Sequence, residues 1–163
     1  MKSSIWIVIG FAALLFAISC NQPNQQPPGI SNSNSPIVEK EVELVALMGR
    51  MQLFMNKLYF AGINENKELR DFYVHELEET MEEIEEGEVI HEGVNISQNM
   101  QMFGTAQLEV FEEALAENST DFKTAYNGFV NACNSCHTAS KYPFIIIKAP
   151  EKPVFDNQVY ESQ

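Results

Sequence analysis

Residues 43–62 read ELVALMGRMQLFMNKLYFAG, and this stretch decides the fold class. Its large apolar side chains recur at alternating spacings of three and four residues, which places them along one side of a helix. The line consists of Leu44, Leu47, Met51, Phe54 and Leu58. The pattern predicts an amphipathic helix over roughly residues 38–61, with Gly62 and Asn64 at its end.

Two further stretches show the same helical spacing of apolar residues. The second predicted helix ends at Gly87, and its apolar side chains are Leu69, Tyr73, Leu77, Met81 and Ile84. The loop GEVIHEGVN at residues 87–95 leads to a third helix that is predicted to end near Asn118. Its apolar side chains are Ile96, Met100, Phe103, Val110, Ala114 and Leu115.

The fourth predicted helix follows three residues, Ser119, Thr120 and Asp121, whose side chains can cap its start, and Pro143 ends it. One of its faces carries Phe122, Ala125, Phe129, Cys133 and Cys136. The connections between the helices are short, and no convincing strand precedes residue 144. The sequence therefore predicts an all-α fold, an antiparallel four-helix bundle.

Charge and length limit the classes of function. The chain has 163 residues, with 23 Asp and Glu against 10 Lys and Arg, and this net charge of -13 argues against a nucleic-acid partner. Acidic residues gather in residues 65–92, whereas residues 122–150 contain none and carry three lysines. The acidic stretch is either an ordinary solvated face or a surface that steers a basic partner protein.

The first twenty residues have the pattern of a secretory signal. Lys2 precedes an apolar run at residues 5–18, which is shorter than the roughly 20 residues of a membrane-spanning helix. The run leads into Ala17-Ile18-Ser19-Cys20, which resembles the lipobox of bacterial lipoproteins. The resemblance implies a signal peptide at residues 1–19 and a lipid on Cys20, anchoring the protein on the periplasmic side of a bacterial membrane. The alternative is an ordinary signal or an uncleaved anchor with an incidental cysteine.

The domain boundaries follow from composition. Residues 20–36 are rich in Asn, Gln, Pro and Ser, which predicts a flexible tether. Residues 37–150 are predicted to form the helical domain, and residues 151–163 a C-terminal tail.

The pentad Cys133-Asn134-Ser135-Cys136-His137 lies in the fourth predicted helix. A c-type haem is attached by two thiols that add to its vinyl groups, and a histidine directly after the second thiol binds the iron. His137 comes four residues after Cys133, so it shares the helical face of that cysteine. The pentad predicts a covalent haem c, with Cys133 and Cys136 as attachment sites and His137 as the proximal iron ligand.

Three other readings of the pentad compete with haem. A redox dithiol is expected near a strand–helix–strand unit, which this pattern lacks. A structural zinc site needs further ligands, and only His75 and His91 are available beyond the pentad in the domain. A chance match or a local disulfide is the third. His75 is expected on the outer side of its helix near Glu79, and His91 in a loop, so neither is favoured as an iron ligand.

A helical bundle outside the cytoplasm with this motif in its last helix resembles the cytochrome c′ family, over roughly residues 38–140. The resemblance implies that the first helix covers the distal side of the haem, and it allows a homodimer. In cytochrome c′ apolar side chains there leave the iron open to small gases, whereas related bundles place a methionine on the iron. Unlike the family, the chain continues well beyond the motif, and Thr138-Ala139-Ser140 precedes the first basic residue, Lys141.

Two functions follow from this resemblance. The first is one-electron transfer outside the cytoplasm, with Met51 as the candidate distal ligand and a redox partner protein that the acidic surface would attract if it is basic. The second is binding or sensing of a small gas such as nitric oxide by a five-coordinate haem, with Met51 serving only in core packing. Enzymatic activity is not expected, because nothing suggests a distal acid–base pair beside the haem.

Overall fold

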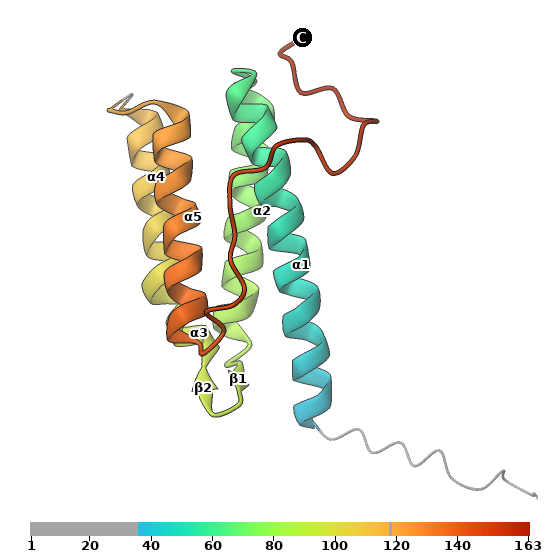
Figure 1. Ribbon diagram of the computed structural model, residues 1–163, viewed down its shortest axis with the longest axis vertical. Coiled ribbons are helices and arrows are strands. Elements are labelled where there is room, and N and C mark those ends of the chain that lie inside the picture. The colour runs from blue at the N-terminus through green and yellow to red at the C-terminus, as the bar shows by residue number, and fades with distance from the viewer. Residues whose placement is uncertain (1–35, 118) are drawn as a thin grey trace, which may run out of the picture. The chain divides into compact units, whose positions relative to one another are not determined.

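The structure, a computed structural model, describes residues 36–117 and 119–163 and is mostly helical over them (Figure 1). The expected all-α class is therefore confirmed. The predicted signal peptide, Cys20 and the tether as far as residue 35 lie outside the described residues. Among the helices that are described, none is long and apolar enough to cross a membrane.

Helices α1 (Pro36–Ile63) and α2 (Lys67–Glu86) pack along each other and run in opposite directions (Figure 1). The predicted apolar lines form their contact. On α1 the buried members are Leu44, Leu47, Met51 and Leu58, and on α2 they are Tyr73, Leu77, Met81 and Ile84. Each large aliphatic side chain buried here stabilises the fold by about 1.5–3 kcal/mol. The regular spacing of these residues therefore stabilises the packing of the two helices.

Helix α5 (Phe122–Ala139) starts where the sequence predicts it. The Asp121 carboxylate accepts a hydrogen bond from the Thr124 backbone N–H at 3.0 Å and caps the helix. The ring of Phe122 lies directly over Gly62, where an added Cβ would come within 2.0 Å of the ring. Gly62 therefore permits close packing between the end of α1 and the start of α5. Helix α5 ends at Ala139, before Pro143 is reached, and Lys141 then takes a left-handed conformation with φ 68°.

The third predicted helix is interrupted. It consists of α3 (Ile96–Asn99), a π-helical turn η1 (Met100–Thr105) and α4 (Ala106–Ala116). The wider π turn rotates the residues that follow it around the helix axis. As a result Val110, predicted to face inward, is 52% exposed, whereas Leu108 and Phe111 are buried.

A short hairpin occupies part of the stretch that was expected to be a loop. Strand β1 (Ile90–His91) pairs antiparallel with β2 (Val94–Asn95), with His91 opposite Val94. The turn between them, Glu92 and Gly93, has positive φ at both residues, as tight hairpin turns require. Strands of two residues are too short to leave a readable alternation in the sequence, so the prediction of a plain loop was wrong here.

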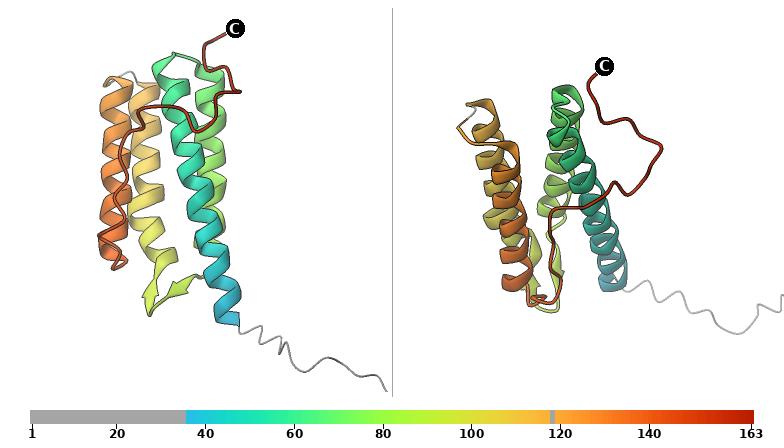
Figure 2. Two further views of the ribbon diagram at one scale, coloured as in Figure 1. Left: turned by 45° about the vertical axis from the view of Figure 1, so that its right-hand side comes forward. Right: turned by 45° about the horizontal axis from the view of Figure 1, so that its top comes forward.

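The chain after α5 turns back along the helices without regular secondary structure (Figures 1 and 2). The side chain of Asn134 accepts from the Ile147 N–H at 2.7 Å and donates to the Ile147 carbonyl at 2.9 Å. Farther on, Asn56 on α1 accepts from the Val154 N–H at 3.0 Å, and Tyr160 is buried against the ring of Phe60. The residues predicted as a C-terminal tail are therefore attached to the helices at these points, although most of their side chains are exposed.

Candidate functional site

Helix α5 presents Cys133, Cys136 and His137 to one cavity. The helix is regular through all three positions, so residues three and four apart lie on one face, as the spacing predicts. Cys136 is buried, and Cys133 and His137 are half-buried. The structure thus brings together the three residues that the sequence selected.

The cavity lies between α1, α5 and the segment after α5, and its volume is about 460 Å³. We call it the α1–α5 cavity. Its size falls in the range of cofactor and ligand sites. Its lining contains no Asp, Glu, Lys or Arg and consists of Leu44, Val45, Met48, Gly49, Met51, Gln52, Met55, His91, Ile96, Cys133, Cys136, His137, Ser140, Tyr142, Ile145 and Ile147.

The position of α5 against α1 is fixed beside this cavity. Tyr126 is buried and donates a hydrogen bond from its hydroxyl to the Met55 carbonyl at 3.0 Å. Burial also raises the pKa of Tyr126, so the hydroxyl stays protonated as a donor. At the other end of α5, the Ser140 hydroxyl accepts from the Asn99 side chain at 3.0 Å. The first bond joins α5 to α1, and the second joins the end of α5 to α3.

The imidazole of His137 is oriented by a backbone carbonyl. Its Nδ1 lies 2.8 Å from the Ile145 carbonyl oxygen, a distance at which a protonated Nδ1 donates to that oxygen. In the neutral tautomer that makes this bond, the other ring nitrogen, Nε2, can bind a metal. Histidine ligands in metalloproteins are commonly held by such a bond on the second nitrogen.

The surroundings of both thiols disfavour the thiolate. Burial, together with the nearby Cys136, raises the pKa of the Cys133 thiol to about 12, and burial also raises the pKa of Cys136. A redox-active dithiol or a reactive nucleophile needs the opposite shift, because the thiolate is the reacting species. The surroundings of these cysteines therefore favour neither of those roles.

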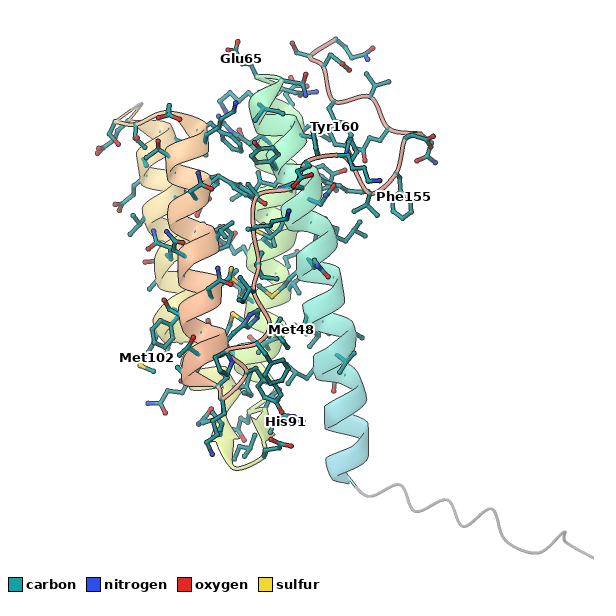
Figure 3. The ribbon with its side chains drawn as sticks, viewed as in Figure 1. Met48, Glu65, His91, Met102, Phe155 and Tyr160 are labelled. Carbon is teal, nitrogen blue, oxygen red and sulfur yellow. The ribbon has the colours of Figure 1, made fainter. Side chains whose placement is uncertain are left out.

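The wall formed by α1 offers three methionines. Met51 lines the cavity, as expected, and it is also packed into the core, with 8% of its surface exposed. Met48 is only half-buried and lies next to Gly49, and Figure 3 shows it on the side of α1 that faces the cavity. The α1 residues that line the cavity spread around one side of the helix. By helical periodicity, Met48 lies near the middle of that side and Met51 at its edge, next to the core.

His91 belongs to the cavity wall, which the sequence did not indicate. The β1–β2 hairpin brings it to the cavity, where its Nε2 lies 2.5 Å from the Tyr142 hydroxyl (Figure 3). Both residues come from segments without a strong sequence pattern, a two-residue strand and the turn after α5. A tertiary contact between such segments leaves no periodic signal.

His75 lies outside the site, as expected. Its side chain is 61% exposed on α2, and its ring nitrogens lie 3.3 Å from a Glu79 carboxylate oxygen and 3.7 Å from one of Glu78. It belongs to an acidic surface of α2 on the outside of the described helices.

No cluster of three or more His, Cys, Asp or Glu side chains in the described ranges is arranged to hold a metal ion. A haem iron does not need such a cluster, because the porphyrin supplies its equatorial ligands. Comparison with known proteins gives no match: no family model, no curated protein and no solved structure is similar to this chain.

Proposed function

We propose that this chain is a c-type cytochrome that binds a single haem covalently and transfers one electron at a time outside the cytoplasm. The observation that carries the proposal is the meeting of Cys133, Cys136 and His137 at one apolar cavity of about 460 Å³. A haem, when bound, supplies the one-electron chemistry, and its flat apolar body matches a lining without carboxylates or basic side chains.

Each residue has a distinct task in this proposal. The neutral thiols of Cys133 and Cys136 form the thioether links, and Nε2 of His137 binds the iron while the Ile145 carbonyl fixes the ring. A methionine of α1, Met48 or Met51, covers the opposite side. The helix directions in Figure 1 support an antiparallel four-helix bundle that carries the haem motif in its last helix, as the resemblance to cytochrome c′ implies.

The alternative function is binding of a small gas such as nitric oxide. One feature of the cavity supports it: the α1 wall includes Gly49, which is exposed and has no side chain to cover the cavity. If no methionine reaches the iron, this space admits a diatomic ligand. The resemblance to cytochrome c′ supports the same function.

Carbon monoxide binding by the reduced protein separates the two functions. We expect the purified, haem-loaded protein to show a single one-electron transition and, when reduced, no spectral change with carbon monoxide, because both axial positions are filled. A reduced protein that binds carbon monoxide at once would contradict the carrier and support the gas-binding alternative.

The proposed location is the periplasmic side of a bacterial membrane, with the protein anchored by a lipid on Cys20 and facing a redox partner protein. An acidic surface on α2, with Glu78, Glu79 and Glu82 exposed, supports a basic partner. The proposal of a homodimer is supported only by the resemblance to cytochrome c′.

Cys20→Ser should abolish lipid attachment, because acylation needs the thiol. Metabolic labelling with a radioactive fatty acid measures this directly, and we expect complete loss of label from the variant. Cys136→Ser is the matched control, since it removes a thiol that the proposal assigns to haem, and it should keep the label. Equal labelling of wild type and Cys20→Ser would contradict the lipid anchor.

A further inference from the structure

We propose that one end of the helical domain rests on the phospholipid surface that holds the lipid anchor. This end is formed by the β1–β2 hairpin and the loop after α5 (Figure 1). We call its exposed apolar residues, Ile90, Phe144 and Ile146, the end patch. The inference rests on the lipid anchor proposed for Cys20, and it adds which end of the domain faces the bilayer.

The side chains of the end patch are among the most exposed large apolar side chains in the described residues. Phe144 and Ile146 are each 75% exposed, and Ile90 is 62% exposed. Ring contacts join the loop after α5 to the hairpin, because the ring centroid of Phe144 lies 5.7 Å from that of Tyr142, which lies 5.6 Å from that of His91. Exposed apolar side chains gathered at one end of a domain indicate an interaction surface. Moving Phe and Ile side chains from water into the boundary between lipid headgroups and acyl chains lowers the free energy.

The length of chain before α1 indicates which end meets the bilayer. The described chain begins at Pro36, at the same end of the helices as the end patch (Figure 1). A flexible linker as long as residues 21–35 has an average end-to-end distance of about 20 Å. Helix α1, with 28 residues, is about 42 Å long. If residues 21–35 form the predicted tether, the anchor lies closer on average to the end patch than to the opposite end of the helices.

The charges around the end patch favour a neutral lipid surface over a strongly charged partner protein. Exposed Lys141 and Lys148 lie near it in the chain after α5, but Glu88 precedes the hairpin and Glu92 lies in its turn, and Lys148 is paired with Glu151 at 2.7 Å. The mixture gives no strong attraction for either sign of charge. Apolar insertion is then the driving force, so the contact should persist in neutral phosphatidylcholine and at high salt.

The test is photo-crosslinking of the full lipoprotein in phosphatidylcholine vesicles. One sample carries Phe144→p-benzoylphenylalanine. The matched control carries Phe155→p-benzoylphenylalanine. Phe155 is also an exposed phenylalanine, with 50% of its surface accessible, but it lies near the opposite end (Figure 3). After flotation of the vesicles and irradiation, mass spectrometry should find several-fold more phospholipid adduct at position 144 than at position 155, with or without high salt.

Four results would overturn the inference. Equal lipid yields at the two positions would show that the end patch does not face the bilayer in preference to the opposite end. A yield at 144 that high salt abolishes would show that apolar insertion does not drive the contact. Adducts at 144 with a second copy of the chain would make the patch a dimer contact. Protein that does not float with the vesicles would overturn the lipid anchor and this inference with it, whereas floating protein with equal yields would overturn the orientation alone.

Discussion

Replacing both Cys133 and Cys136 with alanine should give a protein from which acid–acetone extracts all of the haem. The wild type, produced in a host with haem-maturation machinery, should stay red after the same treatment and give a c-type pyridine haemochrome spectrum. The reason is that only the thioether bonds resist extraction, and both thiols face the α1–α5 cavity.

Each single replacement should weaken attachment, since one thioether bond remains. Ser135→Ala is the matched control, because Ser135 lies between the two cysteines, is exposed, and donates only to the Asn131 carbonyl at 2.9 Å. It should retain the full amount of covalent haem. A wild type that is colourless, or whose haem extracts completely, would end the cytochrome proposal.

Met48→Leu should abolish sulfur ligation of the iron. In the oxidised wild type we expect the weak band at about 695 nm that is typical of sulfur-ligated ferric haem. The variant should lose this band, have a lower reduction potential and bind carbon monoxide. Met48 is favoured because it lies near the middle of the cavity wall and is only half-buried, whereas the side chain of Met51 is committed to the core.

Met51→Leu is the matched control and should keep the band, since leucine fills a similar volume in the core. Loss of the band in Met51→Leu and its retention in Met48→Leu would identify Met51, the candidate predicted from the sequence, as the distal iron ligand. A wild type that lacks the band would favour gas binding. Bis-histidine spectra that vanish in His75→Ala would contradict the exposed position of His75 on α2.

The helices could be predicted from the sequence because their apolar residues have a regular period. The line from Leu44 to Leu58 and the line from Tyr73 to Ile84 both became buried contacts, and Asp121 caps α5 as expected. The inner face of α4 could not be predicted, because the π turn at Met100–Thr105 shifts the phase and leaves Val110 exposed. No local sequence rule gives the position of such a turn.

The candidate site was predictable where it depends on spacing along a helix. Cys133, Cys136 and His137 share a face of α5 and line one cavity, as their separations require. His91, Tyr142 and the Ile145 carbonyl were not predictable, because each reaches the site through a tertiary contact of a loop or a two-residue strand. Whether Cys20 carries a lipid and whether a haem is bound stay predictions.

The wall of the cavity formed by Ile145 and Ile147 has a consequence for biogenesis. These residues belong to a segment without regular secondary structure that is attached to α5 through Asn134 and His137. They follow the pentad in the chain and leave the ribosome after it, so the helices can pack while this side of the cavity is still open. If the proposed haem binds, this order would let it enter before the two hydrogen bonds of Asn134 to Ile147 form that wall.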